Sequence, residues 1–472
     1  MSSGVPSSAN FFLQPAANDI VYAPGGKFQE VRVKHHVNQD LNSGSPLIFK
    51  LPNSEKAVYN LDDTYIKFKL RIVTAANGAA DAVAVYPANG IAHTMWKTVS
   101  LFANGVPACS TYQPYGYKKM LEHILQNNTQ NVHYDKLWGY KKRVSPTGDL
   151  AGNAHGHNYN VAELDRDTMR NADHFTQDNP PLTADWTEFI MRPALDFFDI
   201  NANIMSLTKV DWELRMVPYE NIHCLNWAVN YGALADPLAA GVNNSIATNY
   251  KLQIQPDSVK MFLRTEYLTD EAYLAAMEVG QQEGFKYNYT PTAIKTKTLS
   301  AGHTRVEDTD FAPRSNPVMY CHTFVDHTAF TGHKRRNPYL FRPPPSLSKM
   351  YNYKDGQLIQ EQTPVDLQDP HGSGHWHLYM NNLVSLGVQP YTPGLSYGPD
   401  EIMGGFFMKI ISLAPGGTSP DLLPRTSQGT HDYRFELDQP ADKNYEVITY
   451  IRYETATFIV HIDGMIENTF SG

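Results

Sequence analysis

The sequence predicts an all-β chain that folds as two consecutive β-sandwiches with a few short helices. Aromatic residues make up 12% of the chain and charged residues only 18%, a composition that favours strands around a substantial core. Apolar and polar residues alternate with a period of two along many segments, as in strands with one buried face. The same order of turns, strands and helices also occurs once in each half. A repeat of this length indicates two copies of a domain.

The repeat is clearest at two hairpin turns. In the first half a strand ends at the Asn104-Gly105 turn, and an amphipathic helix is expected to follow at 117–125. In the second half a strand meets the Asp355-Gly356 turn, and an amphipathic stretch follows at 376–386. Both dipeptides favour the left-handed backbone of a tight hairpin, because glycine has no Cβ that would clash.

Strands are expected wherever the alternation is clean. Ile66, Phe68 and Leu70 fall on one face of a strand, while Lys67 and Lys69 fall on the other. The predicted strands are 30–37, 47–51, 66–72, 99–102, 186–200, 207–217, 259–267, 293–299, 318–326, 349–359, 402–413, 432–437, 445–454 and 458–466.

A short helix is expected to join the two sandwiches. Thr269 can cap its N-terminus, Leu274 and Met277 have helical apolar spacing, and Gly280 can end it. The predicted organisation is an extended N-terminal arm at 1–24, a first domain at 25–268, a linker helix at 269–284 and a second domain at 285–472.

Charge and cysteine content narrow the class of protein. The formal net charge is −9 and the basic runs at 141–143 and 334–336 are short, so direct sequence-specific nucleic-acid binding is not expected. Three scattered cysteines do not make a disulfide framework, which predicts synthesis in a reducing compartment. The N-terminus resembles no secretory signal and no apolar run could span a bilayer, so no transmembrane segment is expected.

Histidine gives the strongest signal for site chemistry. His371, His375 and His377 lie in one short stretch, and His155 and His157 could share a metal from one face of a strand. The group at 371–377 has no obvious carboxylate partner at ligand spacing. These histidines are therefore interpreted as surface or capping residues, and no metal is expected.

The remaining candidate groups form no catalytic pattern. The His/Cys neighbours at 223–224 and 321–322 point to opposite faces of a strand, and each cysteine is expected to be a small buried hydrophobe. The carboxylates at 62–63 and those of Asp211 and Glu213 are interpreted as surface charge. The sequence has no phosphate-binding loop and no supported Ser-His-Asp order, so we expect no cofactor and no enzymatic activity.

Three groups of residues resemble the double-jelly-roll viral major capsid proteins. The run 252–264, followed by a short helix and Phe285-Lys286-Tyr287, resembles the seam between the two jelly rolls of that family. The segment 324–332 with Asn337-Pro338-Tyr339-Leu340-Phe341 resembles its strand that runs into a small-residue turn and an Asn-Pro-aromatic turn. The C-terminal stretches that fit its last strands are 403–408, 433–437 and 445–463.

The resemblance spans residues 25–470 and is nearest to the hexon-like proteins of Polinton and adintovirus-type elements. It implies two consecutive eight-stranded jelly rolls, a double jelly roll, in a chain that forms pseudo-hexameric homotrimers tiling an icosahedral shell. The function it implies is that of the major capsid protein of a DNA virus or virus-like element. It further implies a place in the virion, penton and minor capsid proteins as partners, synthesis in the host cytoplasm, and assembly there or in the nucleus.

A second function class stays open at this point. Two sandwiches in one chain could also carry a glycan-binding site, or the site of a metal-dependent enzyme, at the domain junction. The mass of the purified chain separates the two classes, because a capsid protein assembles and such an enzyme can remain a monomer.

Subunit contacts are expected where loops and aromatic residues coincide. The polar stretches 127–185 and 231–249 are too long to be simple connections, so function or contact is expected there. Aromatic side chains dominate most interfaces. The candidates, chosen for loop or helix-start positions, are Tyr112, Tyr115, Trp138, Tyr140 and Trp376.

Overall fold

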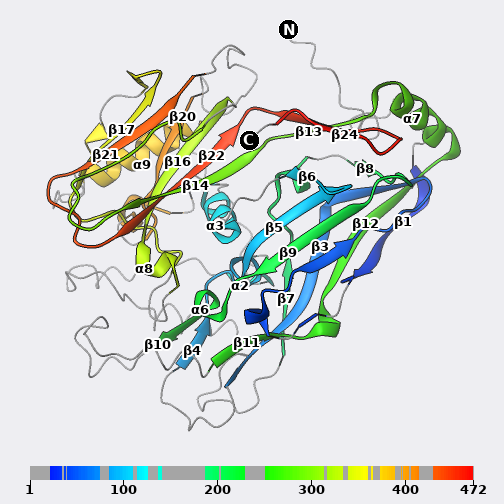
Figure 1. Ribbon diagram of the computed structural model, residues 1–472, viewed down its shortest axis with the longest axis horizontal. Helices are drawn as coiled ribbons and strands as arrows, with labels where there is room; N and C mark the ends of the chain where they lie inside the picture. Colours follow the sequence, from blue (N-terminus) through cyan, green and yellow to red (C-terminus); the bar gives the residue numbers. More distant parts are fainter. Residues whose placement is uncertain are drawn as a thin grey trace.

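The computed structural model shows a mostly β protein built from antiparallel sheets, with a few helices (Figure 1). No helix among the described residues is long and apolar enough to cross a membrane. The structure describes residues 22–34, 37–38, 40–74, 84–109, 114–125, 135, 137–140, 186–200, 203–228, 250–312, 316–332, 338–359, 363–364, 373–387, 395, 397–402, 405–413 and 429–470.

The first half of the chain forms a sandwich of two sheets. The first sheet has the order β1 (Tyr22–Arg32), β12 (Lys260–Leu268), β3 (Ala57–Thr74) and β7 (Thr187–Met191), and β8 (Asn203–Met205) and β11 (Tyr250–Ile254) also pair with β3. The second sheet has the order β2 (Leu47–Lys50), β9 (Trp212–Pro218), β5 (Trp96–Ala103) and β6 (Val106–Cys109).

The second half repeats this topology. Its first sheet has the order β14 (Thr292–Leu299), β22 (Tyr445–Tyr453), β16 (Pro317–Asp326) and β20 (Lys409–Ser412). Its second sheet has the order β15 (Arg305–Asp308), β21 (His431–Leu437), β17 (Leu347–Lys354) and β18 (Gln357–Leu358), with β19 (Thr363–Pro364) on β17. Each half has eight strands that occupy corresponding places in its two sheets, so each half is a jelly roll. In chain order these are β1, β2, β3, β5, β6, β7, β9 and β12 in the first half, and β14, β15, β16, β17, β18, β20, β21 and β22 in the second.

Smaller elements connect or cover the sandwiches. A two-stranded ribbon joins β4 (Ala84–Pro87) to β10 (Leu225–Ala228), and a three-stranded sheet has the order β13 (Phe285–Tyr289), β23 (Ala456–Val460) and β24 (Ile466–Asn468). The α-helices among the described residues are α2 (Ile91–Thr94), α3 (Tyr115–Leu125), α6 (Asn221–Cys224), α7 (Asp270–Glu283), α8 (His327–Phe330) and α9 (Ser373–Ser385). Single 3-10 turns lie at Leu41–Ser43, Asp196–Phe198, Pro256–Ser258 and Pro399–Glu401.

The two hairpin turns predicted from the repeat are confirmed. β5 and β6 meet at Asn104 and Gly105, whose φ angles are 47° and 80°. β17 and β18 meet at Asp355 and Gly356, with φ angles of 51° and 75°. Two successive residues at positive φ make the turn whose twist matches the paired strands, which is why each turn ends in glycine.

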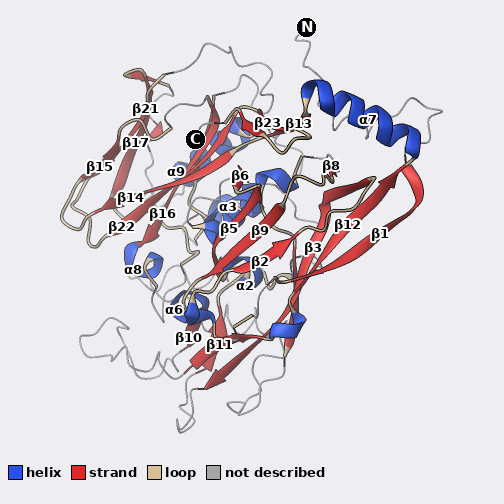
Figure 2. Ribbon diagram, turned by 45° about the vertical axis from the view of Figure 1, so that its right-hand side comes forward, coloured by secondary structure: helices blue, strands red, loops and turns tan. Residues whose placement is uncertain are grey.

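The helix expected at the junction is present as α7 and runs along the edge of the molecule (Figure 2). The Thr269 hydroxyl accepts a hydrogen bond from the Ala272 amide at 3.3 Å, which caps the first turn. The helix runs through Gly280, so the expectation that Gly280 ends it is wrong. It ends at Glu283, and Gly284 follows with a φ of 72°, which suits a residue without a Cβ.

Several predicted strands differ from the observed ones. Of 186–200 only β7 is a strand, because the chain turns at Asp196–Phe198, and in 402–413 the described strand is β20 alone. β1 begins at Tyr22, eight residues before the predicted start at 30, because its early part pairs with the end of β12. The segment 458–466 does not extend the second sandwich. It contributes β23 to the sheet with β13, and Phe458 packs against Phe197 and Trp212 of the first half, with ring centroids 5.4 and 6.0 Å away. Aromatic burial at the first half therefore decides the course of this strand.

Several predicted segments lie outside the described residues. They are residues 1–21 of the arm, most of the polar stretch 127–185 and all of 231–249.

Candidate functional site

Three of the five predicted contact residues are buried in the protein interior. Trp138 and Tyr140 stack with ring centroids 4.8 Å apart, and the Tyr115 hydroxyl is 2.9 Å from Nδ1 of His93. His93 also meets Trp138 edge to face at 5.1 Å. Tyr115 and Trp138 are 0% exposed and Tyr140 is 4% exposed. The expectation that their loop or helix-start positions leave them on the surface is therefore wrong.

The packing of Gly90 and Asp135 around Trp138 explains this burial. Gly90 has a φ of 67°, and a Cβ there would lie 2.5 Å from the indole ring. The indole Nε1 donates to the Asp135 carboxylate at 3.2 Å, so the polar end of the side chain is satisfied. Burial raises the pKa of Asp135 to about 6. A glycine far away in sequence thus makes room for the ring, and no local pattern indicates it.

Of the remaining two contact residues, Tyr112 lies outside the described residues and Trp376 is exposed. Trp376 belongs to the first turns of α9, and 54% of its surface is accessible. Its role in a subunit contact stays a prediction.

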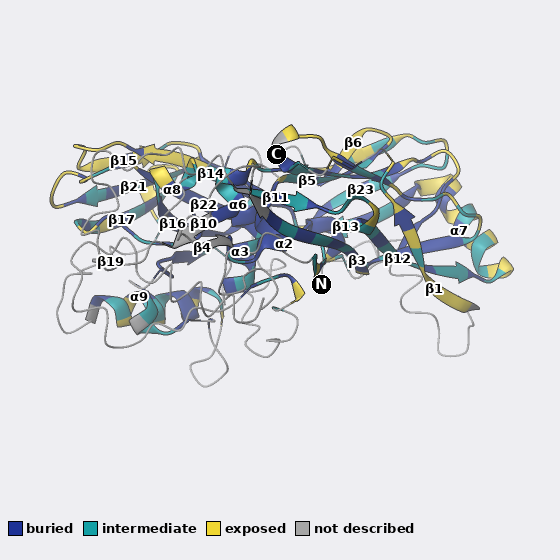
Figure 3. Ribbon diagram, turned by 90° about the horizontal axis from the view of Figure 1, so that it is seen from below, coloured by how far each residue is buried: buried dark blue, intermediate teal, exposed yellow. Residues whose placement is uncertain are grey.

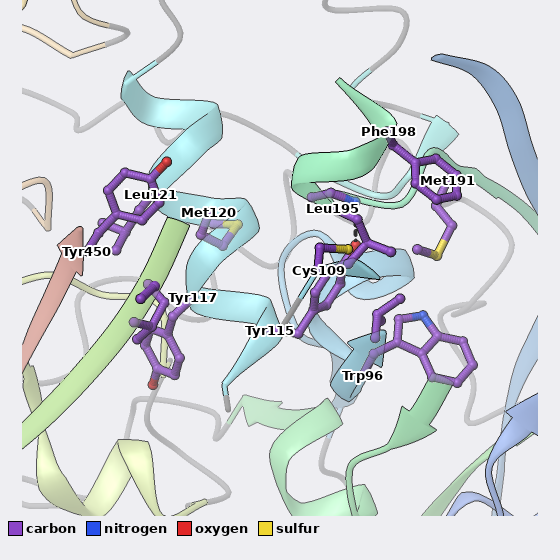
Figure 4. Packing of buried hydrophobic residues seen from close by; sticks show 14 of the residues in the cluster. Trp96, Cys109, Tyr115, Tyr117, Met120, Leu121, Met191, Leu195, Phe198 and Tyr450 are labelled. Atoms are coloured by element: carbon purple, nitrogen blue, oxygen red, sulfur yellow. Dashed lines mark hydrogen bonds between the residues drawn. The ribbon is translucent and has the colours of Figure 1, made fainter. Parts of the chain in front are cut away.

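Helix α3 lies between the two jelly rolls and bonds to both. In Figure 4 its residues Tyr115 and Leu121 face different surroundings, with Leu195 on one side and Tyr450 of β22 on the other. The Tyr117 hydroxyl donates to the carbonyl oxygen of Pro338 at 2.8 Å. The junction of the two halves, where the alternative function placed a site, is therefore built around this helix.

A buried ion cluster lies at the centre of the junction. Lys118 Nζ is 2.5 Å from Asp196 Oδ1, 3.5 Å from Glu122 Oε1 and 3.0 Å from the carbonyl oxygen of Ala194. Asp196 in turn accepts hydrogen bonds from the amide and the hydroxyl of Thr292, at 2.9 and 2.7 Å. Thr292 begins β14, so Asp196 links the first half of the chain to the second.

Burial and the two carboxylates set the protonation of this cluster. Burial raises the pKa of Glu122 to about 7, although the nearby ammonium of Lys118 opposes the rise. Burial alone would lower the pKa of Lys118, but the charges of Asp196 and Glu122 outweigh it and raise that pKa above its ordinary value. The Tyr450 hydroxyl also donates to Glu122 at 3.3 Å. Each charged group is bonded within the chain, as in a structural ion cluster.

Further polar contacts join the halves around this centre. The Tyr339 hydroxyl donates to the Thr94 carbonyl at 3.3 Å, and a Cβ at Gly116 would lie 2.5 Å from that hydroxyl oxygen. The Met205 amide donates to the Tyr287 hydroxyl at 2.9 Å. These bonds tie the first jelly roll to the second at separate places, so the junction is a packed interface.

The cysteines are buried, as the sequence predicted, but His223 and Cys224 lie in helix α6 and not on a strand. Burial raises the pKa values of Cys109 and Cys224 to about 12, and it raises that of Cys321 as well. A thiol with a raised pKa is a poor nucleophile at neutral pH. The neighbouring His322 bonds through its two ring nitrogens to Thr449 Oγ1 at 2.9 Å and to Asn352 Nδ2 at 2.8 Å.

The predicted histidine groups are only partly described. His375 and His377 lie in the first turns of α9, and His155, His157 and His371 are outside the described residues. Within the described part of the chain, no group of three His, Cys, Asp or Glu side chains is placed to hold a metal ion.

Lys409 is a buried lysine that was not predicted from the sequence. Its Nζ lies in the core of the second jelly roll and donates to the Met350 carbonyl at 2.6 Å. Burial lowers the pKa of Lys409 to about 7. The only local signal was a lysine in an otherwise apolar run, Met408 to Ile411.

Comparison with known proteins identifies the fold. No protein-family model matches the sequence, and no curated protein is significantly similar to it. A chain of the Sputnik virophage structure superposes with a TM-score of 0.57 at 10% identity, covering 97% of this chain and 90% of its own. The Faustovirus major capsid protein gives 0.52 at 10% identity, with 95% and 92% covered. VP54 of the virus PBCV-1 gives 0.51 at 10% identity, with 98% and 100% covered. The chain therefore has the double-jelly-roll fold of these viral capsid proteins.

Proposed function

We propose that this protein is the major capsid protein of a DNA virus or virus-like element. It would assemble as a pseudo-hexameric homotrimer, and the trimers would tile an icosahedral shell. The observation that carries the proposal is the repetition of one eight-stranded topology twice in a single chain. Three such chains present six similar lobes, which is the arrangement that packs hexagonally.

The fold similarity supports the same proposal. The alignments with the Sputnik virophage chain and the Faustovirus major capsid protein run over nearly the whole of both chains, so they include both jelly rolls. A similarity to one jelly roll alone would fit many sugar-binding and enzymatic proteins.

The junction of the halves favours a structural role over the alternative site. Lys118, Asp196 and Glu122 bond to one another and to backbone groups of the chain, which fits a group that holds two domains together. We therefore propose no glycan or metal chemistry there.

Other parts of the proposal follow from the capsid role. The chain would divide into an arm at 1–24, jelly rolls at 25–268 and 285–472, and a linker at 269–284. The mature protein would lie in the virion, beside penton and minor capsid proteins, after synthesis in the host cytoplasm and assembly there or in the nucleus. A Polinton or adintovirus-type element is the source that we propose.

The mass of the purified chain tests this function. Size-exclusion chromatography with light scattering should give a particle of three chains, and negative-stain micrographs should show hexagonal outlines or shells. A chain that stays a monomer at every concentration, with no ordered particles in the micrographs, would contradict the proposal.

A further inference from the structure

Helix α9 exposes three large apolar side chains on one face. Trp376, Met380 and Val384 follow one another at intervals of four residues and are 54%, 40% and 70% exposed. The other face of α9 is fixed to the second jelly roll, because Asn382 accepts from the Ile410 amide at 2.9 Å. We call the three exposed residues the α9 stripe. Exposed apolar side chains that cluster in this way mark contact surfaces.

The corresponding helix of the first jelly roll is covered. α3 follows the hairpin of β5 and β6, as α9 follows the hairpin of β17 and β18. The second half of the same chain covers α3. The ring of Tyr117 lies 4.9 Å from that of Tyr339 and 5.6 Å from that of Phe330, and Glu122 bonds to Tyr450. The same place in the fold is thus buried in one half and exposed in the other.

The surface that receives α3 also has an equivalent. α3 meets β14 and β22 of the second half, and β22 and its neighbour β16 are buried on both faces. The equivalent strands of the first half are β1, β12 and β3. β12 is buried on one face only, since its residues alternate between buried and partly exposed. The outer face of this sheet in the first jelly roll is therefore partly exposed, whereas the outer face of the equivalent sheet in the second jelly roll is buried.

The open face of the first jelly roll carries aromatic rings. Phe28 of β1 is 46% exposed, and its ring centroid is 5.6 Å from that of Tyr65. Tyr65 stacks on Phe262 of β12 at 5.0 Å, and the Arg264 guanidinium lies 5.4 Å from the Phe28 ring. We call Phe28, Tyr65 and Phe262 the aromatic face. The aromatic face suits an apolar helix that carries a tryptophan, because an indole ring can pack against the three rings and can also stack with the Arg264 guanidinium.

We propose that the α9 stripe of one copy of this chain docks on the aromatic face of a second copy. This contact would repeat between chains the contact that α3 makes with the second jelly roll inside one chain. Figure 3 shows α9 and β1 at opposite ends of the molecule, so the two surfaces cannot meet within one copy. Two different surfaces that pair head to tail close into a ring when the rotation fits. The inference rests on the proposed function and names the residues that join the trimer.

Directed cross-linking tests the pairing. A chain with both Phe28→Cys and Met380→Cys, treated with a short bismaleimide, should give covalent species of up to three chains. The natural cysteines are buried, so they should not react. A matched control combines Phe28→Cys with Leu274→Cys on α7, because Leu274 is 67% exposed but belongs to neither surface. The control should give no ladder of linked chains.

A charge substitution gives a second readout. Val384→Asp should raise the concentration at which the oligomer is half dissociated by roughly 30-fold or more, as for a central interface residue. Leu274→Asp should leave it unchanged, and circular dichroism should show both variants folded. An assembled wild-type chain whose cysteine pair does not link, or whose Val384→Asp variant assembles normally, overturns this docking but leaves the capsid proposal standing. A wild-type chain that never assembles contradicts the capsid proposal itself.

Discussion

Replacing Lys118 with methionine should destabilise the folded chain more than any exposed lysine substitution. The change keeps most of the side-chain volume but removes the ammonium that lies 2.5 Å from Asp196 and 3.5 Å from Glu122. Both carboxylates then lack their cation in a buried site. Because Asp196 also bonds Thr292 of the second half, the loss should loosen the junction of the two jelly rolls.

The expected loss is about 3–5 kcal/mol of unfolding free energy, the usual cost of removing one partner from a buried ion pair. A matched control is Lys56→Met, which breaks an ion pair with Asp270 at 2.8 Å between side chains that are 38% and 81% exposed. Exposed pairs contribute about 0–1 kcal/mol, because water and salt screen them.

The loss should also depend on pH through Glu122. Its pKa is about 7 because of burial, so the carboxyl is mostly neutral well below that pH and ionised well above it. An ionised Glu122 needs the Lys118 ammonium more than a neutral one does. The destabilisation by Lys118→Met should therefore be larger above pH 7 than below it.

Urea unfolding followed by fluorescence and circular dichroism measures these differences at several pH values. If Lys118→Met cost no more than Lys56→Met, the cluster would not be buried as the structure has it. Equal losses above and below pH 7 would mean that Glu122 does not titrate in this range.

Three further predictions concern other parts of the chain. Trp138→Ala should lower the unfolding free energy by about 3–5 kcal/mol, because a buried ring is lost, and wild-type stability in urea would contradict its place in the core. Lys409, with its pKa lowered from 10.5 to about 7 by burial, binds fewer protons in the folded than in the unfolded state between these values. The unfolding free energy of the wild-type chain should therefore rise with pH between about 7 and 10.5 by more than that of the Lys409→Met variant. Parallel pH profiles of the two proteins would contradict this prediction. Gly105→Ala and Gly356→Ala should each lower the unfolding free energy by about 1 kcal/mol, measured by thermal or urea unfolding, because both residues have a positive φ. An added Cβ meets no atom within 4 Å at either position, so backbone strain is the whole cost. A loss of unfolding free energy at only one of the two glycines would contradict the equivalence of the two hairpins.

Much of the fold could be predicted because its signals are local. Side chains on a strand alternate between faces whatever the strand pairs with, so Ile66, Phe68 and Leu70 indicated a half-buried strand before its partners were known. The turns at Gly105 and Gly356 depend on backbone conformation within a few residues. The cap at Thr269 acts within one helical turn, so the sequence also located α7.

The candidate contact residues could not be located in the same way. A loop position suggested that Trp138 is exposed, but the ring fills space that Gly90 leaves open. The ion cluster pairs Lys118 with Asp196, 78 residues apart in sequence. Neither residue has a neighbour along the chain that predicts the other, since such contacts form only when distant segments pack together.

By itself, the sequence determined two copies of an all-β domain, the hairpin turns and the joining helix. The tertiary structure decided which aromatic residues are buried, which helix is covered and which sheet face stays open. The physical reason is that strand alternation and turn chemistry are set within a few residues. The exposure of α9 and the burial of α3 depend instead on which sheet lies opposite, and that is a property of the assembled halves.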